Sequence, residues 1–396
     1  MAKGNHQVFS IHWVKLISTH IATSALLSSG LSAPYSQTQF PPDQKMSCPL
    51  KSVLVIGGSG FLGSAIVAEL VALNPAPKVA VFDLKIREDT KYPNVSYYTG
   101  DLLNSEDMRS AIKSSDATVI LHTASPVHGL ARDVYMKINV EGTGNIIEVS
   151  KEEGIQALVY TSSAGIVFDG DDLINVNESA PFPKIHMDGY NESKAEAEKL
   201  ILQADDRKGM RTCALRPAGI FGPRDRQCIP GMLTVYYSNQ TKFQIGDNLN
   251  LFDFTYVGNA VHAHILAAEK LLDSQTVDKV AGEAFFITNG EPIYFWDFPL
   301  AVWAHLGHCP PYIIRFPRIV GIGLAAMVEA LSYFRGKEAG FTRFRVKFAC
   351  ASRYYNISKA RDILGYKPLV SLDEGIKRTL KWIDEEQTIQ AQKKVQ

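Results

Sequence analysis

A tyrosine and a lysine four residues apart are the first candidates for chemistry in this sequence. Tyr190 and Lys194 lie in a segment rich in helix formers, so both side chains project from one face of the expected helix. A lysine ammonium beside a phenol stabilises the phenolate and lowers a pKa that is otherwise about 10. The pair therefore predicts a general base, with Tyr190 accepting the proton of an alcohol near neutral pH.

Hydroxyl groups follow an apolar run at residues 160–164. Parallel strands bind ligands at their carboxyl ends, so Ser163 is predicted to hydrogen-bond the reacting oxygen. Ser162 is the less favoured candidate, because neighbouring residues of a strand point to opposite faces. Asn139 is expected either to hold Lys194 through a water molecule or to be an ordinary helix asparagine.

A glycine-rich turn directly follows the first apolar run. Gly57, Gly60 and Gly63 permit a tight turn and a close approach of backbone N–H groups to a pyrophosphate. The helix that follows points its N-terminus at the negative charge. Phe61 and Leu62, which open that helix, complete the predicted phosphate-binding turn.

An acid ends the second apolar run. Asp83 comes twenty residues after Gly63, where a carboxylate binds a ribose 2′-hydroxyl and repels a 2′-phosphate. NAD is therefore favoured over NADP, and the nearby Lys85 and Arg87 keep NADP open.

Further cofactor contacts are expected where later strands end. Asp101 is placed at the adenine, with a solvated turn aspartate as the competing interpretation. The other expected contacts of this kind are Leu102, Ala124 and Pro217.

Apolar runs and helical periodicity alternate from Ser52 onward. Short continuous apolar strands separated by helices predict an α/β fold with a doubly wound parallel (Rossmann) sheet. The expected strands are 53–56, 79–82, 118–121, 158–160 and 213–215, and the expected helices are 62–73, 134–149 and 193–202.

The sequence divides into four parts. Residues 1–50 are an extension, interpreted as a disordered tail or a weak targeting segment, and residues 51–220 form the nucleotide-binding domain. Residues 221–386 are a smaller, loop-rich substrate lobe with some elements returning to the sheet, and 387–396 are a tail. Ser371 and Glu374 are expected to cap a helix packed on that lobe.

Charge and cysteine content exclude several classes of function. Lys plus Arg and Asp plus Glu both count 41, so no net field attracts nucleic acid. Five scattered cysteines indicate neither a disulfide framework nor a metal site. A glycan at Asn191 would block the predicted site, which favours the cytosolic side of a membrane.

The most apolar stretch, 313–334, is interrupted by charged residues and proline. It is therefore a poor membrane span, and either an interfacial helix or a buried helix fits it. His262 and His264 lie in another apolar run and are expected to be structural.

Together these motifs resemble the extended short-chain dehydrogenases, and within them the 3β-hydroxysteroid dehydrogenase family. The fungal sterol-4α-carboxylate 3-dehydrogenases are the most similar subgroup, through residues 160–165, 215–223, 251–257 and 285–292. Arg224 departs from the pattern, because a glycine is expected before Asp225.

The resemblance implies oxidation of a sterol C3 hydroxyl, followed by loss of the neighbouring carboxylate as carbon dioxide. It assigns the catalytic hydroxyl to Ser163, the base to Tyr190 and the lysine to Lys194. Arg224 and Arg226 are candidate partners of the substrate carboxylate, and the competing interpretation is that one of them binds a cofactor phosphate or faces solvent. A cytosolic position on the endoplasmic reticulum membrane, other enzymes of a C4-demethylation complex and a homodimer are further expectations.

Three alternatives stay open on the sequence. The same chemistry on a specialised fungal triterpenoid acid shares every motif. A nucleotide-sugar epimerase or dehydratase shares the fold and the tyrosine, but lacks the apolar C-terminal segment. A cofactor-sensing protein without turnover is disfavoured by the intact Ser163, Tyr190 and Lys194.

Overall fold

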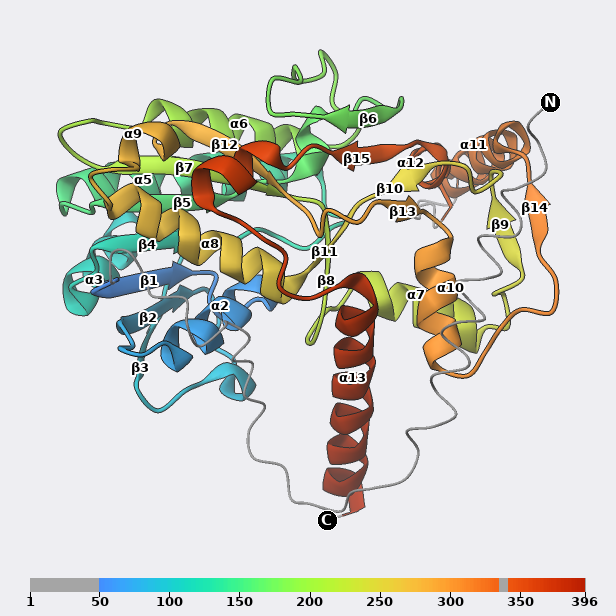
Figure 1. Ribbon diagram of the computed structural model, residues 1–396, viewed down its shortest axis with the longest axis horizontal. Helices are drawn as coiled ribbons and strands as arrows, with labels where there is room; N and C mark the ends of the chain where they lie inside the picture. Colours follow the sequence, from blue (N-terminus) through green and yellow to red (C-terminus); the bar gives the residue numbers. More distant parts are fainter. Residues whose placement is uncertain (1–49, 335–340, 396) are drawn as a thin grey trace.

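The computed structural model describes residues 50–334 and 341–395, and the prediction for the N-terminal extension lies outside this range except for Leu50. A seven-stranded sheet in the order β12-β7-β5-β4-β1-β2-β3 forms one half of the molecule (Figure 1). Every neighbouring pair is parallel. Its strands are β1 (Ser52–Ile56), β2 (Lys78–Asp83), β3 (Val95–Thr99), β4 (Val119–His122), β5 (Ala157–Thr161), β7 (Arg211–Pro217) and β12 (Glu283–Ile287). The predicted doubly wound sheet is confirmed.

Helices cover both faces of this sheet because its strands alternate two apolar sets of side chains. Val53 and Val55 belong to one core with α2 (Phe61–Ala72) and α8 (Val257–Leu272). Leu54 and Ile56 belong to a second core with α3 (Ser105–Ser115), α5 (Gly142–Glu152) and α6 (Gly189–Gln203). The direction of strand order reverses between β1 and β4, the point at which such sheets bind dinucleotides.

The segment expected as one helix over 134–149 has three parts. They are α4 (Arg132–Tyr135), the π-helical η2 (Met136–Glu141) and α5. A π-helical turn inserts an extra residue into the helix and commonly marks a functional site. Asn139, one of the predicted cofactor-site residues, lies in this turn and is buried.

The smaller half contains short strands and helices, as the loop-rich lobe predicts (Figure 1). One sheet has the order β13-β10-β15-β6, and the pairs β8-β11 and β9-β14 stand apart from it. The strands are β6 (Leu173–Val176), β8 (Gly219–Phe221), β9 (Phe243–Ile245), β10 (Leu251–Phe252), β11 (Phe254–Tyr256), β13 (Ile293–Tyr294), β14 (Ile314–Phe316) and β15 (Arg353–Tyr355). Its helices are α7 (Cys228–Tyr237), α10 (Asp297–His305), α11 (Arg318–Phe334), α12 (Arg343–Cys350) and α13 (Leu372–Val395). The short helical turns α9 (Val277–Val280), η1 (Glu88–Thr90), η3 (Ala164–Val167) and η4 (Ala360–Leu364) connect elements elsewhere in the chain.

The two halves exchange strands. β12 comes from the C-terminal part of the chain and completes the large sheet, whereas β6 comes from the N-terminal part and joins the small one. α13 contacts α10 and β11 of the smaller half, and the Glu374 amide donates to Ser371 Oγ at 3.3 Å, as the capping motif predicts. The helix continues to Val395, so the residues expected as a tail are helical almost to their end.

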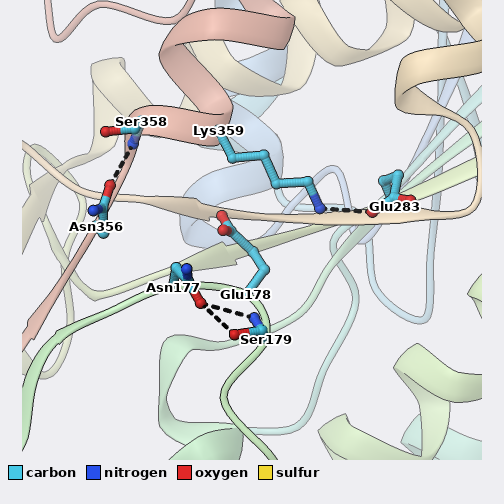
Figure 2. Close-up of a pocket in the computed structure, with 7 residues that line it drawn as sticks. All are labelled: Asn177, Glu178, Ser179, Glu283, Asn356, Ser358 and Lys359. Carbon is cyan, nitrogen blue, oxygen red and sulfur yellow. Dashed lines mark hydrogen bonds and ion pairs between the residues drawn. The ribbon is translucent and has the colours of Figure 1, made fainter.

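Side chains close the β12 edge of the large sheet. Glu178 Oε1 accepts a hydrogen bond from the amide of Phe286 at 2.7 Å. Lys359 donates to the Ala284 carbonyl at 2.8 Å and pairs with Glu283 at 2.6 Å. Figure 2 shows the polar pocket that these groups line. None of the predicted catalytic residues lines this pocket, so it is separate from the site described below. Its side chains instead cover the edge strand of the sheet by bonding to the β12 backbone.

Candidate active site

The first turn of α6 holds the candidate base. The Asp188 carboxylate caps the helix by accepting from the Asn191 amide at 2.7 Å. Tyr190 therefore lies in the first turn, and Lys194 follows one turn later on the same face. Asn191 is 7% exposed and donates its side-chain amide to Asp188. A buried asparagine of this kind is a poor glycan acceptor.

The end of β5 brings Ser163 to the tyrosine. Ser163 and Tyr190 are joined by a side-chain hydrogen bond. Ser163 Oγ also accepts from the amide of Gly165 at 3.1 Å, which holds the hydroxyl in place. Ser162 is 2% exposed, and its hydroxyl has no partner among the described residues. The structure thus joins the preferred serine to Tyr190, as the alternation of the strand predicts.

Lys194 is enclosed beneath this pair. Its ammonium donates to the Thr161 carbonyl at 2.8 Å and lies 4.7 Å from the centre of the Tyr160 ring. Burial lowers the pKa of Lys194 to about 7, and the charge of Glu198 only partly opposes that shift. The lysine is therefore held on the strand end, where it makes a backbone contact.

The prediction that Lys194 lowers the pKa of Tyr190 is wrong for this structure. Burial raises the pKa of Tyr190 above its ordinary value, the negative charge of Asp188 raises it further, and the bond from Ser163 opposes both. The physical reason is that Lys194 is desolvated as well, and its N–H groups are directed at Thr161.

A buried polar layer underlies Lys194. His122 at the end of β4 is hydrogen-bonded to Thr143 at 3.1 Å, and its ring lies 5.3 Å from that of Tyr160. Asn139 donates to Ser193 Oγ at 2.9 Å. Asn139 therefore ties the π-helical turn directly to the residue before Lys194, while its water-mediated contact with the lysine stays a prediction. Neither His122 nor Tyr160 was predicted from the sequence as a site residue, although each is one of the last two residues of a parallel strand.

Two further aromatic residues pack on the phenol. His128 lies with its ring centre 4.1 Å from that of Tyr190, and Tyr135 meets the same ring edge-on at 5.7 Å. Both follow β4, in a loop and a helix for which the sequence predicted no catalytic role. The carboxyl end of a parallel strand was the signal that would have found His128.

The glycine turn has the expected geometry. Gly57 has a φ of +80°, and its amide donates to the Phe82 carbonyl at 2.8 Å. A Cβ on Gly57 would lie 2.7 Å from the backbone of Ala124, and one on Gly63 would collide with the Gly57 carbonyl. Only glycine fits at these two positions. Gly60, Phe61 and Leu62 form the turn and the start of α2, as predicted.

Asp83 closes the turn from β2. Its carboxylate accepts from the Ser59 amide at 3.0 Å and from the Lys85 amide at 3.3 Å. It therefore lies beside the glycine-rich turn, where a ribose hydroxyl is bound in dinucleotide sites. Arg87 is paired with Asp89 at 2.6 Å, so its guanidinium is already engaged.

The other predicted cofactor residues occupy strand ends. Asp101 accepts from the Leu103 amide at 3.0 Å, which makes it part of a turn, and it is exposed. Leu102 packs against the second core, and Pro217 is the last residue of β7. Their contact with a dinucleotide stays a prediction. The described residues include no cluster of His, Cys, Asp or Glu able to hold a metal ion.

The structure gives Arg224 another role than the one expected. Its guanidinium donates to the Asp89 carbonyl at 2.7 Å and pairs with the Asp89 carboxylate at 3.1 Å. Its φ of +72° is a conformation that favours glycine, which explains why glycine was expected here. Arg226 is exposed, whereas His262 and His264 are each 1% exposed, which agrees with the structural role expected for them.

Comparison with known proteins agrees with this geometry. Residues 54–318 match the model of the 3-beta hydroxysteroid dehydrogenase/isomerase family. The chain belongs to this family. The sterol-4-alpha-carboxylate 3-dehydrogenase (decarboxylating) of Schizosaccharomyces pombe is 55% identical over 341 residues, covering 85% of this chain and 99% of that protein. The corresponding human protein is 39% identical over 337 residues, covering 83% of this chain and 87% of that protein.

Solved structures support the fold. The UDP-glucose 4-epimerase of Thermus thermophilus in complex with NAD has a TM-score of 0.62 at 20% identity, covering 83% of this chain and 98% of that chain. At that identity the likeness shows the fold alone. The 3β-hydroxysteroid dehydrogenase family membership identifies the chain as an oxidoreductase with a nicotinamide cofactor, and the epimerase alternative is not supported.

Proposed function

We propose that this protein oxidises the 3β-hydroxyl of a 4α-carboxysterol to the ketone, with loss of the C4 carboxylate as carbon dioxide in sterol biosynthesis. The observation that carries the proposal is the hydrogen-bonded pair of Ser163 and Tyr190 at the carboxyl end of the sheet, one helical turn from Lys194. The relatives at 39% to 55% identity named for this reaction support the choice of substrate.

Each catalytic residue has a distinct role in the proposed oxidation. Ser163 and Tyr190 hold the C3 oxygen. The phenolate form of Tyr190, which the positive charge of a bound oxidised cofactor would favour against the raised pKa of the free residue, accepts the hydroxyl proton as the C3 hydrogen leaves with its electron pair. The oxidised nicotinamide supplies the hydride acceptor and a positive charge. Lys194 stands one turn below, where its partial protonation near pH 7 lets it take or return a proton.

Loss of carbon dioxide follows from the product itself. A 3-ketone with a carboxylate on the adjacent carbon breaks the bond between C4 and the carboxylate carbon, and the electron pair moves onto the ketone as an enolate. Ser163 and Tyr190 are placed to hydrogen-bond that oxygen as well. Protonation of the enolate at C4 then gives the 3-ketone. Because the ketone itself accepts the electron pair, the step requires no metal ion.

NAD is the proposed cofactor. The Asp83 carboxylate stands at the ribose position and repels a 2′-phosphate, while Arg87 is held by Asp89. Both features disfavour NADP. Titration of the protein with NADH and NADPH, followed by fluorescence, tests this choice, and equal affinity for the two would refute it.

The proposed reaction is tested with purified protein, a 4α-carboxysterol and NAD. NADH and carbon dioxide should form together, and Tyr190→Phe should lose both by roughly 100-fold or more while still binding NADH. Cofactor binding without turnover of the wild-type protein would reject the sterol acid and direct the search to other triterpenoid acids.

We further propose that α11 rests on the cytosolic face of the endoplasmic reticulum membrane. Val320, Leu324, Met327 and Leu331 follow helical spacing and are 43% to 55% exposed, and Ile319 beside them is 83% exposed. No described helix is long and apolar enough to cross a bilayer. An apolar stripe on a surface helix is typical of interfacial binding.

Vesicle sedimentation tests the membrane contact. The full chain should sediment with phosphatidylcholine and phosphatidylinositol vesicles, and Leu324→Glu with Met327→Glu should release it. Ile174→Glu is the matched control, because Ile174 is 59% exposed on β6, outside the stripe. Equal release by the control would show that a general loss of surface apolarity, and not α11, is responsible.

A further inference from the structure

The proposed substrate carries a carboxylate next to the reacting carbon, and the catalytic residues do not account for its binding. Ser163 and Tyr190 contact the C3 oxygen, and Lys194 is directed at Thr161. Arg224, which the sequence suggested, is engaged by Asp89. A polar group beside the Tyr190 ring is therefore required on the substrate side.

His128 occupies that position. Its ring lies 4.1 Å from the Tyr190 ring at an angle of 52°. The loop that carries it is fixed on both sides by Tyr135, whose hydroxyl donates to the Val127 carbonyl at 2.7 Å and accepts from the Leu130 amide at 3.1 Å. His128 is thus held against the base by backbone bonds that flank it.

The surroundings of His128 suit a charged group on an apolar molecule. Its imidazole is exposed and makes no hydrogen bond to another described residue. Val127 is 63% exposed and Leu130 is 44% exposed, so apolar side chains lie on either side of it in the loop. A hydrocarbon skeleton covering these side chains would exclude water and strengthen a polar contact made by the imidazole.

The charged groups around His128 act in opposite directions. Partial burial against its neighbours lowers the pKa of His128, and the nearby Asp188 raises it while Lys194 lowers it. Tyr190 and Tyr135 are the other titratable groups of this cluster. A carboxylate in contact with the imidazole adds a second negative charge beside Asp188 and favours the protonated ring.

We propose that His128 is a specificity-determining residue that donates an N–H hydrogen bond to the C4 carboxylate of the substrate. The carboxylate is attached to the carbon adjacent to C3, and the C3 oxygen is held at the Tyr190 hydroxyl. A side chain that packs against the Tyr190 ring, as His128 does, is therefore placed to reach a carboxylate next to the C3 oxygen. This inference rests on the proposed function, because it needs a substrate with an acid at this position.

The experiment compares His128→Phe with His128→Gln. Phenylalanine keeps a ring on Tyr190 and removes the donor, whereas glutamine keeps an N–H donor. The wild type and both variants are titrated, as complexes with NADH, with a 4α-carboxysterol and with its methyl ester, so that no turnover occurs. The kcat and KM for the acid are measured in parallel with NAD.

His128→Phe should weaken binding of the acid by roughly 10- to 100-fold and raise KM more than it lowers kcat. Binding of the ester should change less than about twofold, and His128→Gln should restore part of the affinity for the acid. Equal losses on acid and ester, or no loss on either, would overturn the proposal. Failure of the wild type to oxidise the acid would instead reject the proposed function, so the two failures are distinguishable.

Discussion

α2 and α11 are both apolar helices, yet their surroundings are opposite. Ile66 of α2 is fully buried, because the helix lies between β1, β2 and α8. Ile319 of α11 is 83% exposed, because the helix packs mainly on α12. Figure 1 shows α2 beside the large sheet and α11 at the far side of the smaller half. Apolar composition alone therefore does not decide which helix is part of the core.

Glycines distinguish the two helices further. In α2, Gly63 lets the helix approach the backbone of the glycine turn, which positions the helix N-terminus for a phosphate. In α11, a Cβ added to Gly323 would meet nothing within 4 Å. Glycine is therefore required for close packing in α2, whereas in α11 it only adds to the conformational entropy lost on folding.

The largest expected effect is at these glycines. Gly63→Ala should abolish binding of NADH, because its Cβ collides with the Gly57 carbonyl. Gly323→Ala should leave binding intact and raise the free energy of unfolding by about 0.5–1 kcal/mol. NADH fluorescence and urea unfolding measure the two quantities. Normal cofactor affinity in Gly63→Ala would show that the turn is less tightly packed than described.

Truncation of apolar side chains should give the next largest contrast. Ile66→Ala should lower the free energy of unfolding by roughly 2–5 kcal/mol, because it leaves a cavity in the core. Ile319→Ala should change it by less than about 0.5 kcal/mol. Urea unfolding in detergent-free buffer measures both. A large loss for Ile319→Ala would mean that the exposed face of α11 is covered in solution.

The smallest contrast concerns pH. Burial raises the pKa of Glu69 in α2 from 4.5 to about 7, so the folded protein binds more protons than the unfolded chain in that interval. Stability should therefore fall as pH rises from 4.5 to about 7. Glu329 of α11 has the opposite sign, because its bonds with Arg343 lower its pKa and stabilise the folded protein at higher pH.

Glu69→Gln tests this difference. Its stability relative to the wild type should increase by about 1–3 kcal/mol between pH 5 and pH 8, since the amide cannot ionise. Glu329→Gln is the matched control. Its stability relative to the wild type should fall slightly as the pH rises from 5 and then stay constant up to pH 8. Parallel pH profiles for Glu69→Gln and the wild type would contradict the raised pKa.

The sequence predicted the main sheet well because its signals are local. Each strand of residues 53–56, 79–82 and 158–160 is a continuous apolar run, and burial on both faces imposes that pattern. The π-helical turn at Asn139 was missed, because a widened turn keeps an almost helical spacing of apolar residues.

Spacing in the sequence was enough to predict which residues form the candidate site, but it did not predict their pKa values. Tyr190 and Lys194 are close because a helix brings residues four apart onto one face. The pKa values of both depend on burial by other elements, which the spacing does not contain. The ion pair of Arg224 with Asp89 was not predicted for the same reason, because the two residues are far apart in the sequence.

The sequence by itself determined the alternation of strands and helices in the main sheet, the glycine turn, and the candidate residues for binding and oxidising an alcohol. These features depend on backbone conformations and periodicities that a few neighbouring residues specify. The tertiary structure decided which apolar helix is buried, how strongly Lys194 and Tyr190 are desolvated, and that His128 packs against the Tyr190 ring. These properties depend on contacts between segments that are far apart in the chain. Burial and neighbouring charges can shift the pKa of a side chain only after the fold has formed those contacts.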